Sequence, residues 1–461
     1  MKTDRMLAGA AQVDITPVMG TQIAGDIGRR RPVEAVLDPI FAKALVVESG
    51  GKKICVLSLD ICVIGRKWAD AIRRGAEQRF GFDQKAVMVH PVQNHAAPAM
   101  GHLFLPDDDA PCRYFPEKYP WLKGGDDAYN HFALERILEV IGQADKSCQP
   151  VSYGMASGLE CRVAFNRRYI MRDGTAKTHP GYNNPNVLFC EGPIDPEVGV
   201  AAFKAESGLY IAMLLHHTCH PVHGFPLRYI TAGWPGAWST KVRVRQGLNC
   251  VPLVINGCCG NIHYNNPLNP FHDDDWHHLG GLLAEDTDAI LAKIDYQAKG
   301  FVDYVSKTIR IPVRLPPPAE IRRMRQYMRK HPEPVWKKGM KGDAVERDWV
   351  YAASGLEVID YFKSRPYFEY EIQAFRIGDI LLAGLPGEVF VEGQLRIKLG
   401  SPRRYTFLAH ICNTYAGYIP TREAFEHGGF ETRFSNGSKL VTNALDIIVK
   451  ETLKLLKDLG N

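Results

Sequence analysis

The chain has 461 residues, of which 45% are hydrophobic and 23% are charged. This composition is typical of a folded globular protein and excludes an intrinsically disordered chain. The net charge of +5 is small for this length. Nucleic-acid-binding proteins usually concentrate basic residues on one face, so nucleic acid is not an expected partner.

The N-terminus lacks the apolar core of an export signal, and no run of about 18 apolar residues occurs anywhere in the sequence. We therefore expect no membrane span and a cytoplasmic location. At this location the 11 cysteines are expected to be reduced thiols. They contain no CxxC pair, so a structural zinc site of cysteines is not expected.

Apolar runs bounded by turn residues predict the elements of the first half of the chain. In order, they are a strand at 9–17, a hairpin of strands 42–48 and 53–60, a surface helix at 66–80, a strand at 86–90 and a helix at 127–145. Residues 161–196 are rich in turn signals and are expected to be loops.

The second half continues with the same alternation of strands and helices. The pattern predicts a strand at 208–215, a helix at 236–247, a strand at 251–256, a helix at 277–295, strands at 369–376 and 379–384, and a last helix at 438–458 that includes Leu440 in its apolar stripe. We therefore predict an α/β fold, layered, with central β-sheets flanked by helices. Residues 1–461 are expected to form one domain, with 316–365 as an insertion or lid region because its prolines and basic residues mark a change in composition.

Four histidines lie between His216 and His223, directly after the apolar strand 208–215, where Pro221 and Gly224 break regular structure. Loops at strand ends are common places for functional sites. Imidazole is the most common metal ligand and is suited to acid–base catalysis near neutral pH. The sequence therefore predicts a site at this strand end.

Polar clusters follow other predicted strands as well. They are His90/Gln93/His95, Asn166/Arg167, Asn261/His263, Glu388 and Asn413–Tyr418. A catalytic zinc site needs three nitrogen, oxygen or sulfur ligands and an open position for water. Two histidines and a carboxylate from separate strand ends would supply them. No HExxH motif is present, so spacing alone does not identify a metal.

Several short motifs together resemble the catalytic domain of the neutral/alkaline (non-lysosomal) ceramidase family. They occur in the family's order from residue 9 to about 425: Ala11-Gln-Val-Asp-Ile-Thr-Pro17, Asp38-Pro-Ile-Phe-Ala-Lys-Ala-Leu45, Gly192-Pro-Ile-Asp-Pro-Glu197, Ala232-Gly-Trp-Pro-Gly236, Cys259-Gly-Asn-Ile262, Pro386-Gly-Glu388 and Asn413-Thr-Tyr-Ala-Gly-Tyr418-Ile-Pro-Thr-Arg-Glu423. We expect no counterpart of the family's C-terminal immunoglobulin-like domain in residues 1–461.

The resemblance implies a zinc-dependent amidase with an α/β catalytic domain, whose zinc is held by two histidines, a glutamate and a tyrosine. By position, His220, Glu388 and Tyr418 match three of these ligands, and Arg167 matches an arginine that contacts the substrate. The family's Thr-His-Thr-His-Ser-Gly-Pro motif reads Val92-Gln-Asn-His-Ala-Ala-Pro98 here. Its substrate-facing second histidine matches His95.

Two departures from the family pattern affect the chemistry. Gln93 replaces the first, zinc-binding histidine of that motif, and glutamine is a poor zinc ligand. Either His95 or His90 supplies the missing nitrogen, or a metal that prefers oxygen ligands binds, or no metal binds. The serine proposed as the family's nucleophile is also absent, because the chain reads Gly260-Asn-Ile-His263. His263 is expected to be a general base, a ligand or a substrate contact.

The first hypothesis is a metal-dependent hydrolase, with Zn²⁺ as the expected cofactor, that cleaves an amide bond of a small polar substrate through a metal-bound water. The expected metal ligands are His95, His220, Glu388 and Tyr418; the expected catalytic residues are His95, His263, Glu388 and Arg167; and the expected substrate contacts are Gln93, Asn94, Asn261 and Arg167.

Two alternatives stay open, a glycoside or ester hydrolase on the same scaffold and a non-catalytic binding protein that has lost the chemistry. Ceramide itself is not the expected substrate. A homo-oligomer is compatible with the sequence.

Overall fold

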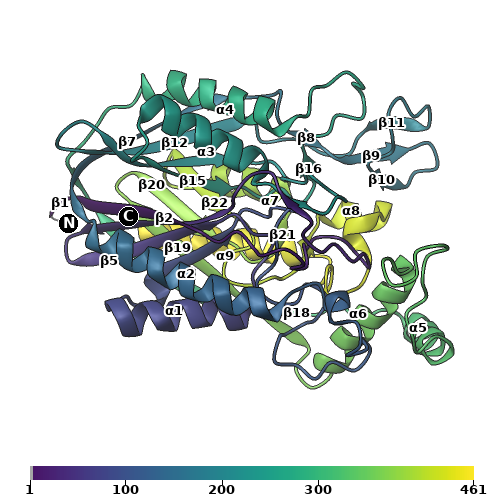
Figure 1. The fold of residues 1–461 in the computed structure, drawn as a ribbon. Helices are drawn as coiled ribbons and strands as arrows, with labels where there is room; N and C mark the ends of the chain where they lie inside the picture. The colour runs from purple at the N-terminus through teal and green to yellow at the C-terminus, as the bar shows by residue number, and fades with distance from the viewer. Residues whose placement is uncertain (1–3, 461) are drawn as a thin grey trace.

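The computed structural model describes residues 4–460 and contains two stacked β-sheets with helices on both outer sides (Figure 1). The large sheet has the strand order β15 (Val251–Asn256), β13 (Tyr210–His217), β12 (Glu197–Ala205), β7 (Gln149–Leu159), β2 (Leu7–Asp14), β4 (Phe41–Ser49), β5 (Lys52–Leu59) and β6 (Val87–Pro91). Its two edge pairs, β13–β15 and β5–β6, are parallel, and the pairs between them are antiparallel.

The smaller sheet has the order β18 (Val302–Pro312), β19 (Tyr367–Ile377), β20 (Ile380–Gly384) and β22 (Tyr405–Ala409). Its inner face packs on the large sheet through a common apolar core that includes Leu45, Val56, Phe203, Phe375 and Phe407. Strands such as β15 and β20 are buried at every position, because the other sheet covers one face and helices cover the other.

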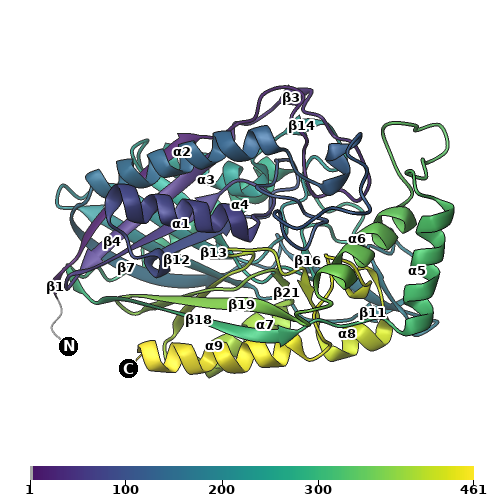
Figure 2. The ribbon, with the colours of Figure 1, turned by 90° about the horizontal axis from the view of Figure 1, so that it is seen from below.

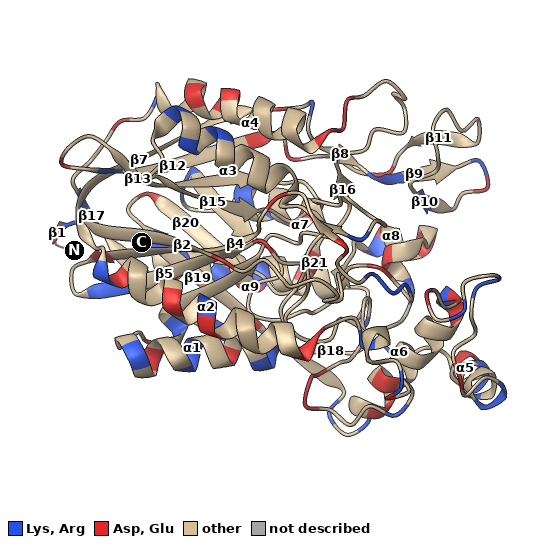
Figure 3. Cartoon of the chain, in the orientation of Figure 1, with Lys and Arg blue, Asp and Glu red and all other residues tan. Residues whose placement is uncertain are grey.

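Helices cover both outer faces. On the large sheet lie α1 (Arg66–Phe80), α2 (Asp127–Lys146), α3 (Gly233–Gln246) and α4 (Trp276–Leu291). On the small sheet lies α9 (Ala444–Gly460), which also contacts α7 (Val391–Gly400). Figure 2 shows α1 and α2 on one side of the strands and α9 on the other. Charged residues occur along α1, α2, α4 and α5 and in many of the loops (Figure 3).

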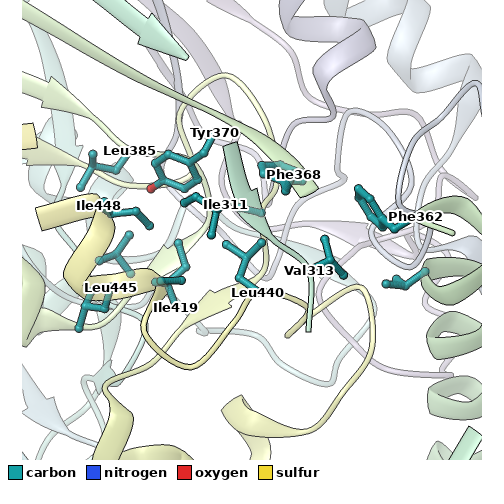
Figure 4. Close-up of a cluster of buried hydrophobic side chains, with 14 of the residues drawn as sticks. Ile311, Val313, Phe362, Phe368, Tyr370, Leu385, Ile419, Leu440, Leu445 and Ile448 are labelled. Atoms are coloured by element: carbon teal, nitrogen blue, oxygen red, sulfur yellow. The ribbon is translucent and has the colours of Figure 1, made fainter. Parts of the chain in front are cut away.

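The core under α9 extends beyond the small sheet toward α5 (Pro318–Lys330) and α6 (Arg347–Tyr361), which pack on each other. Figure 4 shows part of this core, where Ile311, Phe368 and Tyr370 from the sheet meet Leu445 and Ile448 from α9. Helix α6 is therefore anchored to the same core as α9, and its inner surface is fixed relative to the sheets.

Much of the predicted secondary structure is confirmed, including the 42–48/53–60 hairpin and the helix at 66–80. The predicted α/β class with helices on both sides of the sheets is also confirmed. The last helix was predicted to begin too early, because it starts at Ala444. Leu440 instead forms a β-bridge with Val313 before the helix. The region 161–196, predicted as loops, contains the short strands β8 (Phe165–Asn166), β9 (Arg168–Met171), β10 (Ala176–Thr178) and β11 (Val187–Cys190).

Two short strand pairs join segments that are distant in sequence. β21 (Glu388–Val389) pairs in parallel with β23 (Tyr418–Ile419), which places Glu388 beside Tyr418. β16 (Ile262–His263) pairs with β8, which places His263 beside Phe165. These pairs bring four of the polar strand ends to one end of the sheets. Within residues 4–460, no helix is both long and apolar enough to span a membrane.

The loop that leads to β23 is held by a buried lysine. Lys439 is fully buried, and its Nζ donates hydrogen bonds to the backbone carbonyls of Ala416 at 2.9 Å and Asn436 at 3.0 Å. A third carbonyl, from Tyr415, lies 3.4 Å away. Burial lowers the pKa of Lys439 to about 7. The ammonium group therefore satisfies two carbonyls of the loop that carries Tyr415 and Tyr418 and links this loop to the carbonyl of Asn436 in the segment before α9.

We expect Lys439→Met to lower the free energy of unfolding by about 1–3 kcal/mol, because buried carbonyls lose their donor. The pKa of Lys439 is about 7 in the folded state, below the ordinary value of about 10.4. Between these two pKa values the unfolded wild-type chain binds more protons than the folded chain, so the free energy of unfolding of wild type rises with pH. Lys439→Met lacks this titration, so its stability deficit relative to wild type grows as the pH rises. Thermal melting at several pH values, with exposed Lys450→Met as the control, measures this. Parallel pH profiles for wild type and Lys439→Met would contradict it.

Candidate functional site

A cavity of about 280 Å³ opens at the end of the sheets where these strand ends meet. Its polar wall contains seven of the nine residues predicted for the site: Gln93, His95, Arg167, His220, His263, Glu388 and Tyr418. Its apolar wall is formed by Ile27, Val63, Leu103, Phe104, Val222, Phe225, Val350 and Phe430. The site is therefore assembled from the segments after β6 and β13 and from β16, β21 and β23.

His95 and His220 form a contact pair in this cavity, with their Nε2 atoms 2.8 Å apart. The Nδ1 of His95 lies 3.1 Å from the carbonyl oxygen of Gly25, which can accept only an N–H. His95 therefore carries its proton on Nδ1 and presents the lone pair of Nε2 to His220. Burial, together with Arg31 and Arg167, lowers the pKa of His95 to about 3. Burial and His95 also lower the pKa of His220, so both rings are neutral near pH 7.

His263 has the opposite tautomer. Its Nδ1 accepts a hydrogen bond of 2.9 Å from the backbone N–H of Asn265, so the proton of the neutral ring is on Nε2. The ring of His179 packs edge-on against it, with the ring centres 4.5 Å apart. Both rings line the cavity. His263 thus acts toward the cavity as a hydrogen-bond donor.

Glu388 is the carboxyl group of the cavity wall. Its Oε1 accepts a hydrogen bond of 2.7 Å from the hydroxyl of Tyr415, whereas its Oε2 is buried without a hydrogen-bond partner. Burial raises the pKa of Glu388, although Arg167, Tyr415 and Gln93 act in the opposite direction. A buried carboxyl oxygen without a partner is costly and commonly marks a functional group.

Arg167 is held at the base of the cavity by several acceptors. Its Nε donates to Glu431 at 3.0 Å and its Nη2 donates to the carbonyl of Gly260 at 2.7 Å. Arg168 donates to the other oxygen of Glu431 at 2.6 Å and also pairs with Glu191. Burial alone would raise the pKa of Glu431, but the two arginines outweigh it and lower that pKa. The positive charge of Arg167 is therefore shared between Glu431 and a negative charge on Glu388.

The two predicted asparagine contacts lie outside the cavity wall. Asn94 donates to the carbonyl of Thr231 at 2.7 Å and accepts from the N–H of Ala96. Asn261 donates to Glu392 and accepts from the N–H of Val391 at 2.9 Å. Both amides are buried and engaged in holding loops, and their contact with a substrate stays a prediction.

Three other histidines from the polar clusters lie away from the cavity. His90 accepts from the N–H of Asn256 at 3.0 Å, and its Nδ1 lies 2.8 Å from the carbonyl of His410, so both ring nitrogens are already bonded to backbone. His216 stacks on Phe407, and His217 packs edge-on against Trp234. Of these clusters, only His95, His220 and Gln93 reach the cavity.

The expected zinc ligands do not form a zinc site in this arrangement. Within residues 4–460, no three His, Cys, Asp or Glu side chains converge closely enough to hold one ion. The 2.8 Å between His95 and His220 is a hydrogen-bond distance, whereas two nitrogens on a tetrahedral zinc at 2.0–2.1 Å stand about 3.3 Å apart. Gln93 occupies the position of the missing histidine, with a left-handed φ of 69°, and accepts a contact of 3.4 Å from Cys259.

Three residues to which the sequence analysis gave no role are part of the site, and one of them, Tyr415, lies in the predicted polar cluster Asn413–Tyr418. Tyr415 binds Glu388, His179 packs on His263, and Glu431 fixes Arg167. Tyr415 lies three residues before Tyr418 in the segment Asn413–Glu423, and this position could have suggested that Tyr415 belongs to the site. Glu431 and His179 stand in loops without a recognisable pattern, and only the folded chain brings them to the site.

Comparisons with known proteins agree with the resemblance predicted from the motifs. No protein-family model matches the sequence, and no curated protein matches it. Among solved structures, neutral ceramidase from Pseudomonas aeruginosa superimposes with a TM-score of 0.73 at 16% identity, covering 100% of this chain and 75% of that chain. A ceramidase complexed with C2 gives a TM-score of 0.71 at 15% identity, covering 99% and 75%. This chain therefore has the fold of neutral ceramidase, a hydrolase.

Proposed function

We propose that this chain is a hydrolase that cleaves an amide bond of a small substrate in the cavity around Glu388. The observation that carries the proposal is the meeting of Glu388, His95, His220 and His263 in one wall, with an oxygen of Glu388 left without a partner. The fold of neutral ceramidase supports a hydrolase. The cavity volume of about 280 Å³ favours a compact substrate over a long-chain lipid.

Amide hydrolysis needs a base for the attacking water, a donor for the developing oxyanion and a proton for the leaving nitrogen. In the proposed mechanism, the carboxylate of Glu388 accepts the proton of the attacking water through Oε2 and later passes it on, because the Nε2 lone pair of His95 is already directed to His220. The Nε2–H of His263 donates a hydrogen bond to the substrate oxygen. Glu388 carries a proton to the leaving nitrogen, because its Oε2 lies in the wall without another partner. Gln93 and Arg167 orient the substrate.

The glycosidase alternative has less support. Most glycosidases use two carboxyl groups on either side of the scissile bond. Among the described residues that line the cavity, Glu388 is the only carboxyl group. Ester cleavage needs the same catalytic side chains as amide cleavage, so esters are the appropriate second class of test substrate.

We expect Glu388→Gln to lower kcat for a short N-acyl substrate by about 10²–10⁴-fold, the range of one general acid or base. The variant keeps the hydrogen bond from Tyr415, so the fold should be retained. Release of free amine from N-butyryl substrates, and of alcohol from the matching esters, measures the effect. Glu423→Gln, on the exposed start of α8 (Arg422–His427), is the control. A wild-type chain that releases neither product would overturn the proposal.

No step of the proposed mechanism uses zinc, because the ligand set does not converge. We expect protein purified from zinc-supplemented culture to contain well under one zinc per chain, and its melting temperature and activity to be unchanged by a chelator. Elemental mass spectrometry on wild type and His220→Ala measures the metal content. One zinc per chain in wild type, lost in His220→Ala, would contradict this expectation and would favour the zinc-bound water of the sequence-based hypothesis.

A further inference from the structure

One wall of the cavity comes from a single face of α6. Arg347, Val350, Tyr351 and Ser354 all line the cavity, and their spacing of three and four residues places them on one side of a helix. Helix α6 belongs to the region 316–365, which the sequence predicts as an insertion or lid. One part of the cavity wall is therefore supplied by this region.

This wall carries two arginines near the cavity mouth, Arg347 from α6 and Arg433 from the loop after Phe430–Thr432. Both are exposed at the surface as well. The guanidinium carbon of Arg433 lies 3.7 Å from the centre of the Tyr351 ring. Burial raises the pKa of the Tyr351 hydroxyl to about 12, and the positive charges of Arg433 and Arg347 limit this rise. The two guanidinium groups and this hydroxyl thus lie close together.

The acidic groups nearby do not neutralise this pair. Asp348 contacts Arg433 at 2.7 Å, but the pair lies on the outside, with the Asp348 side chain 75% exposed. An exposed ion pair of this kind is weak and exchanges readily for another anion. Asp26, which also interacts with Arg347, already pairs with Arg29 at 3.0 Å. The mouth of the cavity therefore has an excess of positive charge.

We propose that the substrate carries an anionic group, a carboxylate or a phosphate ester, on the amine side of its scissile amide, and that Arg347 and Arg433 bind this group. The inference rests on the proposed amide hydrolysis and names its substrate class. Guanidinium groups favour carboxylate and phosphate because their planar donors match paired oxygens. The acyl part of the substrate then lies against the apolar wall that includes Leu103, Phe104 and Phe225. A neutral amino alcohol would leave both arginines without a ligand.

Calorimetric binding of three matched ligands to the full chain tests this proposal. They are N-butyrylglycine, its uncharged analogue N-butyrylglycinamide, and N-butyrylethanolamine phosphate. We expect wild type to bind at least one anionic ligand about tenfold or more tightly than the glycinamide, with the preference falling as salt increases. The ligand with the stronger preference identifies carboxylate or phosphate as the natural group.

Arg347→Gln/Arg433→Gln should bring the affinities for anionic and neutral ligands to within about twofold of each other, while the affinity for the glycinamide stays unchanged. The control is Lys338→Gln/Lys341→Gln, which removes two exposed charges from the same region and should keep the preference. Equal binding of charged and neutral ligands by wild type, a preference retained in the arginine double variant, or no binding of any of the three at millimolar concentration would overturn the proposal.

Turnover of N-butyrylglycine, measured separately, distinguishes this inference from the proposed function. If anions bind selectively but no amide or ester is cleaved, the hydrolase proposal fails and the anion site stands. If the glycinamide is cleaved as efficiently as the glycine derivative, the hydrolase proposal stands and the anion site fails.

Discussion

The site depends on one buried carboxylate, that of Glu431, shared between Arg167 and Arg168. All three side chains are almost completely buried. Taking such charges out of water is expensive, and removing one partner of a buried pair commonly costs about 3–5 kcal/mol because the other charge is left uncompensated. Glu431 belongs to the segment before Arg433, and the two arginines join β8 to β9. The shared carboxylate therefore ties two loops that form opposite parts of the cavity wall.

This charge arrangement also determines what the rest of the cavity can do. Arg167 is held in place by Glu431 and by the carbonyl of Gly260, and the charge of Glu431 offsets its own. Glu388 is left to handle protons there, beside the neutral pair His95–His220. Two further arginines line the cavity, Arg347 and Arg433, and within residues 4–460 the one ion pair of Arg433 is the exposed one with Asp348. The cavity wall thus combines a carboxyl group with neutral histidines, apolar side chains and two surface-exposed arginines.

The sequence predicted the general fold and most of the cavity wall for a clear physical reason. Apolar strands and amphipathic helices have strong periodic signals, and polar residues directly after buried strands tend to gather at one end of a sheet. This is how Gln93, His220 and Glu388 could be placed near one another before the structure was known. The same reasoning does not show which way a loop side chain points. Asn94 lies between Gln93 and His95 and yet turns inward to the backbone of Thr231.

Other features could not be read from local sequence at all. The expected zinc ligands match the family by their positions in the sequence. Whether three of these side chains converge on one ion depends on small differences in the placement of separate loops. The start of the last helix was missed because Leu440 continues the helical spacing while its backbone pairs with Val313. Strands β7 and β12 are rich in glycine, alanine and serine, which carry a weak strand signal. Their pairing with one another stabilises them in the middle of the sheet.

The pairing of β21 with β23 has a consequence for how this protein can vary. Because Glu388 and Tyr418 are neighbours across a strand pair, the chain between them leaves the site and returns to it at the same place. That excursion contains α7 and β22 and turns at the exposed residues near Arg404. Extra residues at this turn would lengthen a surface loop, whose closure cost grows slowly with length, without moving the two ends. Length variation in relatives can therefore accumulate there while the geometry of the cavity is preserved.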